Sequence, residues 1–397
     1  MLACATTTPT VAQALRLHQE AFLSRYERIL TPPQRQALRD VAACHSAALG
    51  GHVFACPECG RQKITYNSCR NRHCPQCQAA DNAAWLEREQ TYLLPVTYYH
   101  VVFTVPDSVA CWLQLNPRRL YDAFFAAVNE TLREVAANPR HLGAVVGVVA
   151  VLHTWGQNLH YHPHIHCIAS GGGLSCDAQG RIDAAPQWRS CRPGFFLPVR
   201  VLSRLFRGKF LAALRALAAA GVLRPPAGLE EPKAWRDWLA QQYAKEWVVY
   251  AKEPFGNAGV ALKYLARYTH RVAIGNSRLV EVNEAEVTFR YKDYAADHRP
   301  RQMTLAGVEF VRRWLQHVLP RGFVKVRHWG LLANGQRAER LELSRRLLWG
   351  EWVAEAVGQA VAEEEKPKVQ EKPRCPCCGV ELVAVEVLPR LAKEDTS

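Results

Sequence analysis

Two neighbouring stretches decide the fold of this chain: Gly143–Thr154, which reads GAVVGVVAVLHT, and His160–His166, which reads HYHPHIH. The first is a continuous valine-rich run, typical of a central strand that is buried on both faces. In the second, histidines stand at every other position, as side chains on one face of a strand do. The two stretches therefore predict two strands, the second of which carries a row of imidazoles.

Within the histidine row, Pro163 interrupts the strand's hydrogen bonds, so His164 and His166 form the cleaner pair. Two imidazoles at i and i+2 on one face can share a metal ion, while Ile165 points into the core. Two ligands leave coordination positions open, which suits a catalytic ion that also binds substrate oxygens. Two other interpretations are a strand whose histidines only form hydrogen bonds, and a zinc hydrolase site, although no HExxH motif is present.

A second feature is the pair Tyr264 and Tyr268, one turn apart in a helix predicted over 260–272. The leucines of this helix form a stripe on roughly the opposite side, so the tyrosines are presented rather than packed in a core. A phenol has a pKa near 10 and is a poor nucleophile at neutral pH. The flanking Lys263 and Arg267, with a metal-polarised phosphate, favour the phenolate. We therefore expect two catalytic tyrosines that act in successive transesterifications.

The charge of the chain predicts a polyanionic partner. It carries 50 lysines and arginines against 36 acidic residues, a formal net charge of +14. No stretch is long and apolar enough to span a bilayer, and the N-terminus lacks the pattern of a secretory signal. Without export, the fourteen cysteines are expected to be thiols or thiolates that bind metal rather than disulfides.

The cysteine pairs predict a zinc module. Cys56-x2-Cys59 and Cys74-x2-Cys77, with 14 residues between the pairs, are expected to form one four-thiolate Zn²⁺ site. Nearby basic residues, Arg70 and Arg72 among them, favour DNA binding by the module over a purely structural zinc. Two alternatives are open for four further residues of the module: they bind a second zinc, or they have no role in metal binding. These residues are Cys44, His52, Cys69 and His73.

Near the C-terminus, Cys375-x2-Cys378 looks like half of a zinc ribbon, with Cys377 between the two. No second pair follows it in the sequence. Two interpretations stay open: the motif is vestigial, or it completes a site between two chains.

Basic and aromatic residues later in the chain allow two interpretations. A basic amphipathic helix is predicted over 201–220, and Arg312-Arg313 is among the basic residues that follow. Trp235, Trp238 and Trp247 are interleaved with charge, and together such residues can grip single-stranded DNA. For any one of these tryptophans, an anchor in a helix core is the better interpretation.

The order of predicted elements indicates an α+β protein with a largely antiparallel sheet flanked by helices. Helices are expected on both sides of a break at Thr31-Pro32-Pro33, and strands over Tyr98–Val105, a hairpin over 278–291 and Phe323–His328. The histidine strand is expected to end at Gly171-Gly172-Gly173. The predicted domains are an N-terminal helical segment (1–43), a zinc-binding DNA-binding domain (44–90), a nuclease domain (91–350) and a flexible tail (351–397).

Taken together, these motifs resemble those of bacterial rolling-circle transposases of the insertion-sequence ninety-one type. These are two-tyrosine HUH (His-hydrophobe-His) endonucleases with an N-terminal zinc-binding domain. The resemblance covers roughly residues 40–345. It is carried by NSCRNRHCPQC (67–77), YHVVFTVP (99–106), HTWGQNL (153–159), HPHIH (162–166), YLARYTHRVAI (264–274) and KDY (292–294).

The resemblance implies an HUH fold in which His164 and His166 hold Mg²⁺ or Mn²⁺. A tyrosine would attack single-stranded DNA at the element's end and give a 5′-phosphotyrosine and a free 3′-OH. Gln157 stands where related initiators carry a third, polar ligand, and His160 and His153 compete for that role. The implied partners are transposon ends, target DNA and host replication or helicase proteins, since the chain has no helicase P-loop. The implied location is the bacterial cytoplasm, at the nucleoid.

Two other classes of function remain as alternatives. A replication initiator or relaxase of the HUH class would use the same chemistry at a different DNA origin. A zinc-finger regulator without catalysis would explain the cysteines and the charge, but it would leave the histidine and tyrosine motifs without a role.

Overall fold

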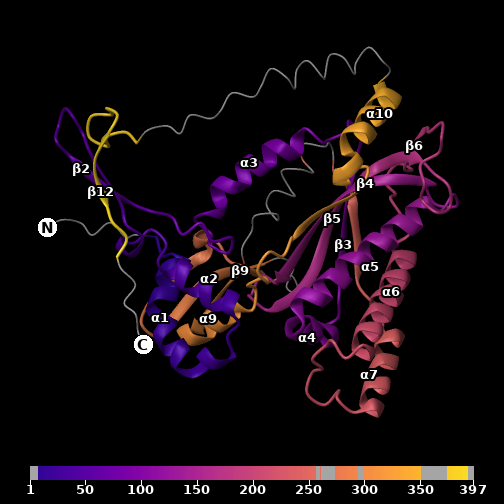
Figure 1. Ribbon diagram of the computed structural model, residues 1–397, viewed down its shortest axis with the longest axis horizontal. Helices are drawn as coiled ribbons and strands as arrows, with labels where there is room; N and C mark the ends of the chain where they lie inside the picture. The colour runs from indigo at the N-terminus through magenta and orange to yellow at the C-terminus, as the bar shows by residue number, and fades with distance from the viewer. Residues whose placement is uncertain (1–7, 256–259, 261–272, 294–298, 350–372, 392–397) are drawn as a thin grey trace.

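The computed structural model describes residues 8–255, 260, 273–293, 299–349 and 373–391. Its centre is an antiparallel sheet with the strand order β11-β4-β5-β3-β7, and β6 pairs with β5 (Figure 1). These strands are β3 (Tyr98–Thr104), β4 (Ala144–Trp155), β5 (Tyr161–Ser175), β6 (Trp188–Ser190), β7 (Val249–Phe255) and β11 (Val326–Gly330). The predicted α+β class with an antiparallel sheet is confirmed.

The valine-rich stretch and the histidine stretch are β4 and β5, which pair with each other over most of their length. The prediction that the histidine strand ends at the three glycines was wrong, since β5 continues through them to Ser175. A Cβ at Gly173 would lie 2.0 Å from the carbonyl oxygen of Val145. The glycines therefore let neighbouring backbones approach closely inside the sheet, and they do not end the strand.

Helices cover both faces of the central sheet (Figure 1). On one face, Ile165 of β5 lies in a core with Phe124 and Phe206. That core is built with α4 (Asp107–Leu115), α5 (Pro117–Ala137), α6 (Val199–Ala219) and α7 (Pro232–Ala244). On the other face, Val149 and Val151 of β4 pack with residues of α3 (Gln78–Gln90) and α10 (Arg337–Trp349). Burial on both faces explains why β4 is apolar without alternation.

The N-terminal helices pack against a later part of the chain. They are α1 (Val11–Tyr26) and α2 (Pro32–Ala42), and the predicted break is confirmed, with Thr31 at the N-cap in a capping box. Their core includes Phe310 and Trp314 of α9 (Gly307–Leu315). It also includes residues of a second antiparallel sheet, formed by β8 (Leu279–Val282), β9 (Glu286–Asp293) and β10 (Arg299–Ala306).

A third antiparallel sheet joins distant segments of the chain. In it, β1 lies between β2 and β12. The strands are β1 (Gly51–Ala55), β2 (Gln62–Tyr66) and β12 (Val383–Leu388), and short helical turns elsewhere span Glu27–Ile29, Ala47–Leu49, Asn276–Arg278 and Asn334–Gln336. Among the described helices, none is both long and apolar enough to cross a bilayer.

Candidate functional site

Three histidines from two paired strands form a cluster on the central sheet. His153 of β4 lies opposite His164 of β5 in the register, and His166 follows on the same face. The ring centroids are 5.5 Å apart for His153 and His164, 4.6 Å for His153 and His166, and 4.7 Å for His164 and His166. One ring nitrogen of each residue lies within 4.8 Å of the others, a separation at which one metal ion can bind all three.

Burial keeps two imidazoles of the cluster, those of His164 and His166, neutral. Burial lowers the pKa of His164 to about 4 and holds the pKa of His166 well below its ordinary value. His164 Nδ1 lies 2.7 Å from the carbonyl oxygen of His162. Because a carbonyl only accepts, Nδ1 carries the proton, which leaves the lone pair of Nε2 for a metal.

His100 of β3 extends the cluster and was not singled out from the sequence. Its Nε2 lies 2.8 Å from Nδ1 of His166, and the two rings stack at 5.0 Å. A second imidazole in this position fixes the orientation of the His166 ring. The available signal was the alternation within Tyr98–Thr104, which puts position 100 on the same face as the cluster once β3 pairs with β5.

Two further candidates for the third metal ligand lie in or beside the turn between β4 and β5. Gln157 is in the turn, where its backbone carbonyl accepts a hydrogen bond from Arg278. His160 ends the turn and is exposed. Of the competing histidines, His153 is the one grouped with His164 and His166. The assignment of Gln157 as a ligand stays a prediction.

The predicted tyrosine nucleophiles are not part of this geometry. Tyr264 and Tyr268 lie outside the described residues, as do the supporting Lys263 and Arg267. Their roles stay predictions from the sequence.

The cysteines of the zinc module, together with two from the C-terminal motif, form two clusters of four, and both differ from the predicted grouping. Cys74 and Cys77 do not share a cluster with Cys56 and Cys59, so that prediction was wrong. The first cluster is Cys44, Cys69, Cys74 and Cys77, and the second is Cys56, Cys59, Cys375 and Cys378. Within the first cluster, Cys44 Sγ lies 3.7 Å from Cys77 Sγ and 3.5 Å from Cys74 Sγ.

In the second cluster, two similar turns from opposite ends of the chain face each other. Cys56 Sγ lies 3.3 Å from Cys378 Sγ, and Cys59 Sγ lies 3.6 Å from Cys375 Sγ. The C-terminal half ribbon is thus completed within the same chain, by pairing of β12 with β1. Neither interpretation from the sequence, a vestigial motif or a site between chains, included this arrangement.

The sequence held a signal for this pairing, because both turns read Cys-Pro-x-Cys-Gly (residues 56–60 and 375–379). Gly60 and Gly379 both adopt positive φ, at 67° and 74°, a conformation that favours glycine. Each glycine N–H donates to the carbonyl of the first cysteine, at 3.0 and 2.9 Å. Backbone N–H groups of Cys378 and Cys377 lower the pKa of Cys375 to about 6, which favours the thiolate that a metal requires.

The remaining predicted residues of the module have other contacts. His73 is not in either cluster, since its Nε2 accepts from the backbone N–H of Leu319 at 3.1 Å and its Nδ1 lies 3.1 Å from Asn71 Oδ1. His52 lies in β1, also outside both clusters. Histidine ligands at these two positions are therefore corrected to Cys74 and Cys77 in the first cluster.

The two predicted DNA-binding arginines differ in their surroundings. The guanidinium of Arg72 donates to the carbonyl of Phe323 at 2.7 Å, and burial lowers its pKa. Arg70 is exposed and adopts positive φ. Their contact with DNA stays a prediction, and the geometry favours Arg70 as the more accessible of the two.

For the tryptophans, the core interpretation holds. Trp235 and Trp238 of α7 stack at 5.3 Å, and both pack against Trp112 of α4. Trp247 is buried in the same core.

Comparison with known proteins agrees with both groups of motifs. A family model described as "Transposase zinc-binding domain" matches residues 14–105, and one described as "Putative transposase" matches residues 147–340. The chain is 44% identical over 388 residues to "Putative transposase y4qJ" of Sinorhizobium fredii, covering 96% of this chain and 95% of that protein. It is 28% identical over 303 residues to "Transposase for insertion sequence element IS801" of Pseudomonas savastanoi, covering 75% and 70%. No solved structure matches.

These comparisons show that this protein, with its mixed fold, its histidine cluster and its cysteine-rich module, is a DNA transposase with a zinc-binding domain. The chain is a member of the insertion-sequence ninety-one transposase family. Its substrate is DNA, and its cysteine clusters support Zn²⁺ as a cofactor.

Proposed function

We propose that this protein cleaves and rejoins single-stranded DNA at the ends of its insertion sequence through metal-assisted tyrosine attack, in rolling-circle-type transposition. The observation that carries the proposal is the cluster of His153, His164 and His166, whose ring nitrogens gather on one face of the sheet. Such a chemistry needs an ion with open coordination positions, and three protein ligands leave those positions free.

We propose His153 as the third ligand beside His164 and His166. Among Mg²⁺ and Mn²⁺, the donor set fits Mn²⁺ better, because imidazole nitrogen binds the softer ion more readily than Mg²⁺. When bound, the ion would polarise the phosphate that is to be cleaved. His100 would fix the ring of His166, and the carbonyl of His162 would fix the tautomer of His164.

The proposed nucleophile is the phenolic oxygen of Tyr264 or Tyr268. It attacks phosphorus, the bond from phosphorus to the 3′ oxygen breaks, and the proton lost by the phenol is balanced by the one gained at the leaving 3′-OH. The products are a 5′-phosphotyrosine and a free 3′ end. The second tyrosine would repeat the reaction on another strand, so that ends are exchanged without hydrolysis. Lys263 and Arg267 would stabilise the charge that develops at phosphorus.

We also propose one Zn²⁺ in each four-cysteine cluster, because thiolates are soft ligands that select zinc and close a tetrahedral site. The chain would act at the nucleoid in the bacterial cytoplasm, with strand separation supplied by host replication or helicase proteins.

The test is an adduct assay. Purified full-length protein is incubated with Mn²⁺ and a labelled single-stranded oligonucleotide from an element end. We expect a covalent band that survives SDS, and mass spectrometry should place the DNA on Tyr264 or Tyr268. Tight binding without any adduct would favour the zinc-finger regulator instead.

A further inference from the structure

A cleft of about 560 Å³ opens at the end of the central sheet, next to the turn between β4 and β5. Its walls come from that turn, from α4, from α9 and from β10. The side chains that matter for its chemistry are Arg312, Arg313, Gln114, Gln316, Met303 and Asp107. Neither the comparisons with known proteins nor the three candidate metal sites among the described residues account for this cleft.

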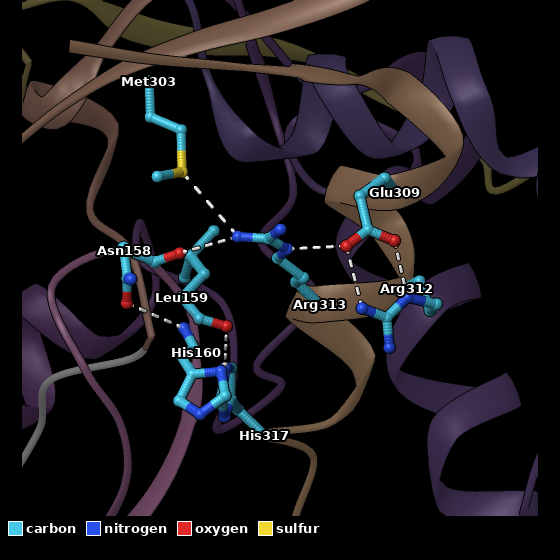
Figure 2. Close-up of polar contacts among 8 residues, drawn as sticks. All are labelled: Asn158, Leu159, His160, Met303, Glu309, Arg312, Arg313 and His317. Carbon is cyan, nitrogen blue, oxygen red and sulfur yellow. Dashed lines mark hydrogen bonds and ion pairs between the residues drawn. The ribbon is translucent and has the colours of Figure 1, made fainter.

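Two guanidinium groups in the cleft are held by one carboxylate (Figure 2). Glu309 accepts from Nε and Nη2 of Arg312, at 2.5 and 2.8 Å, and from Nε of Arg313 at 2.6 Å. Two positive charges against one negative charge leave the trio with a net charge of +1. The arginines therefore stay attractive to an anion after the ion pairs are counted.

The two arginines have different further contacts. Nη1 of Arg313 donates to the carbonyl of Asn158 at 3.3 Å and lies 3.7 Å from the sulfur of Met303, so this arginine holds the turn (Figure 2). Within the described residues, Nη1 of Arg312 makes no hydrogen bond, and its side chain is 41% exposed. A guanidinium fixed by a carboxylate on one edge and open on the other suits a phosphate oxygen.

The rest of the cleft fits a nucleotide. Gln114 and Gln316 offer amide groups, and Met303 offers an apolar, polarisable surface. Among the described residues that line the cleft, the one carboxylate is that of Asp107, which is exposed and lies 3.8 Å from His162 Nδ1.

The cleft and the histidine cluster are connected by Asp107 and His162. Asp107 contacts His162, and the ring of His162 lies 5.3 Å from the ring of His164. His160, which lines the cleft, is four residues before His164, or about 13 Å along a strand. A DNA strand cleaved at the cluster would therefore pass the cleft with a neighbouring nucleotide.

We propose that this cleft binds a nucleotide of the single-stranded DNA substrate that flanks the cleaved phosphate, with Arg312 bound to its phosphodiester. The proposal rests on the proposed function, since it takes the histidine cluster as the place of cleavage. Arg313 and Glu309 are positioning residues, which hold the turn and the guanidinium of Arg312.

The first experiment measures binding of a fluorescent single-stranded oligonucleotide from an element end to full-length Arg312→Gln across a range of NaCl concentrations. We expect Kd to rise about tenfold at low salt, because a charge-assisted phosphate contact is lost. The slope of log Kd against log salt should fall by about 0.7, the value for one phosphate contact on a single strand.

The matched control is Arg346→Gln, which removes a guanidinium that is likewise paired with a carboxylate on its own helix, α10. Its Kd should stay within about twofold of the wild type. Thermal melting of both variants excludes a folding defect as the cause.

The second experiment replaces single phosphates near the cleavage position by uncharged methylphosphonates. At the contacted phosphate, the replacement should weaken binding to the wild type but cause no further loss in Arg312→Gln, because the two partners share one interaction. Additive losses at every position, or wild-type binding by Arg312→Gln, would overturn the proposal. A wild type that binds DNA normally but forms no adduct would instead count against the proposed tyrosine chemistry.

Discussion

Burial and hydrogen bonding define the state of two of the three imidazoles in the histidine cluster. His164 and His166 are neutral because they are buried, and their Nδ1 atoms are engaged by the carbonyl of His162 and by His100. His153 completes the set from the neighbouring strand. The choice of the third ligand can therefore be tested one residue at a time.

We expect His164→Ala and His166→Ala each to lower the rate of adduct formation at least about a hundredfold, because charge stabilisation at the phosphate is lost. Binding of single-stranded DNA should change by less than about twofold, since the cluster contributes little to affinity. Rates are measured with the labelled oligonucleotide and affinities by anisotropy. An active His164→Ala, His166→Ala double variant would contradict the metal assignment.

The third ligand separates His153 from Gln157. We expect His153→Ala to weaken Mn²⁺ binding by at least about tenfold, as loss of even an outer partner of a metal ligand does. Gln157→Ala should bind Mn²⁺ like the wild type. Calorimetric titration with Mn²⁺ measures both, and the reverse result would assign the ligand to Gln157.

The prediction for the two tyrosines rests on the sequence alone. Tyr264→Phe and Tyr268→Phe should each block complete transposition, because one hydroxyl cannot hold one DNA end and attack another at the same time. Each single variant should still nick an oligonucleotide, and the double variant should form no adduct while it still binds DNA. Mass spectrometry of a trapped adduct checks this, and a DNA-linked peptide without either tyrosine would show that the nucleophile is another residue.

At the scale of elements, the two Cys-Pro-x-Cys-Gly turns and the pairing of β1 with β12 form a ribbon from both ends of the chain. Strand pairing alone between segments more than 300 residues apart has to offset a large loss of chain entropy. A shared metal ion would supply that stabilisation, since the binding free energy of a structural zinc contributes directly to folding.

We expect two Zn²⁺ per chain, and one in the variant Cys375→Ser, Cys378→Ser, as measured by metal analysis of the purified protein. In that variant, residues 373–391 should also become sensitive to protease, because the shared metal site that holds them to β1 is lost. Cys377→Ser is the matched control, since Cys377 lies in the same turn, is exposed and is outside both clusters. A double variant that retains two zinc ions would refute the assignment of the ribbon.

At the scale of the whole molecule, the N-terminal helices are part of the same core as α9, which carries Arg312 and Arg313. Cys44 and Cys74 of the first cysteine cluster lie in that core as well. The zinc module and the cleft beside the histidine cluster are thus joined by apolar packing. A substitution in α1 should therefore affect the packing of α9.

We expect Leu15→Ala to destabilise the protein by about 2–5 kcal/mol, because it removes a fully buried side chain from this core. Leu17→Ala on the same helix should change stability by less than about 0.5 kcal/mol, since Leu17 is 43% exposed. Urea unfolding measures both. Equal effects of the two changes would mean that α1 does not pack on α9 in solution.

Features that depend on local periodicity could be predicted from the amino-acid sequence. The valine run and the alternating histidines placed β4, β5 and the pair His164–His166, because a strand repeats every two residues. Thr31 and the two prolines after it indicated where α2 begins, and so separated the two N-terminal helices. The family also followed from motifs that stand within short stretches of chain.

Features that depend on contacts between distant segments of the chain could not be predicted from the sequence and became visible in the fold. His153 and His100 became neighbours of His166 through strand register, and spacing along the chain does not encode register. The cysteine pairs were grouped wrongly from their spacing, because a thiolate from residue 375 can be as close as one from residue 74 once β12 pairs with β1. The cleft at Arg312 likewise exists only where α9 packs against the turn between β4 and β5.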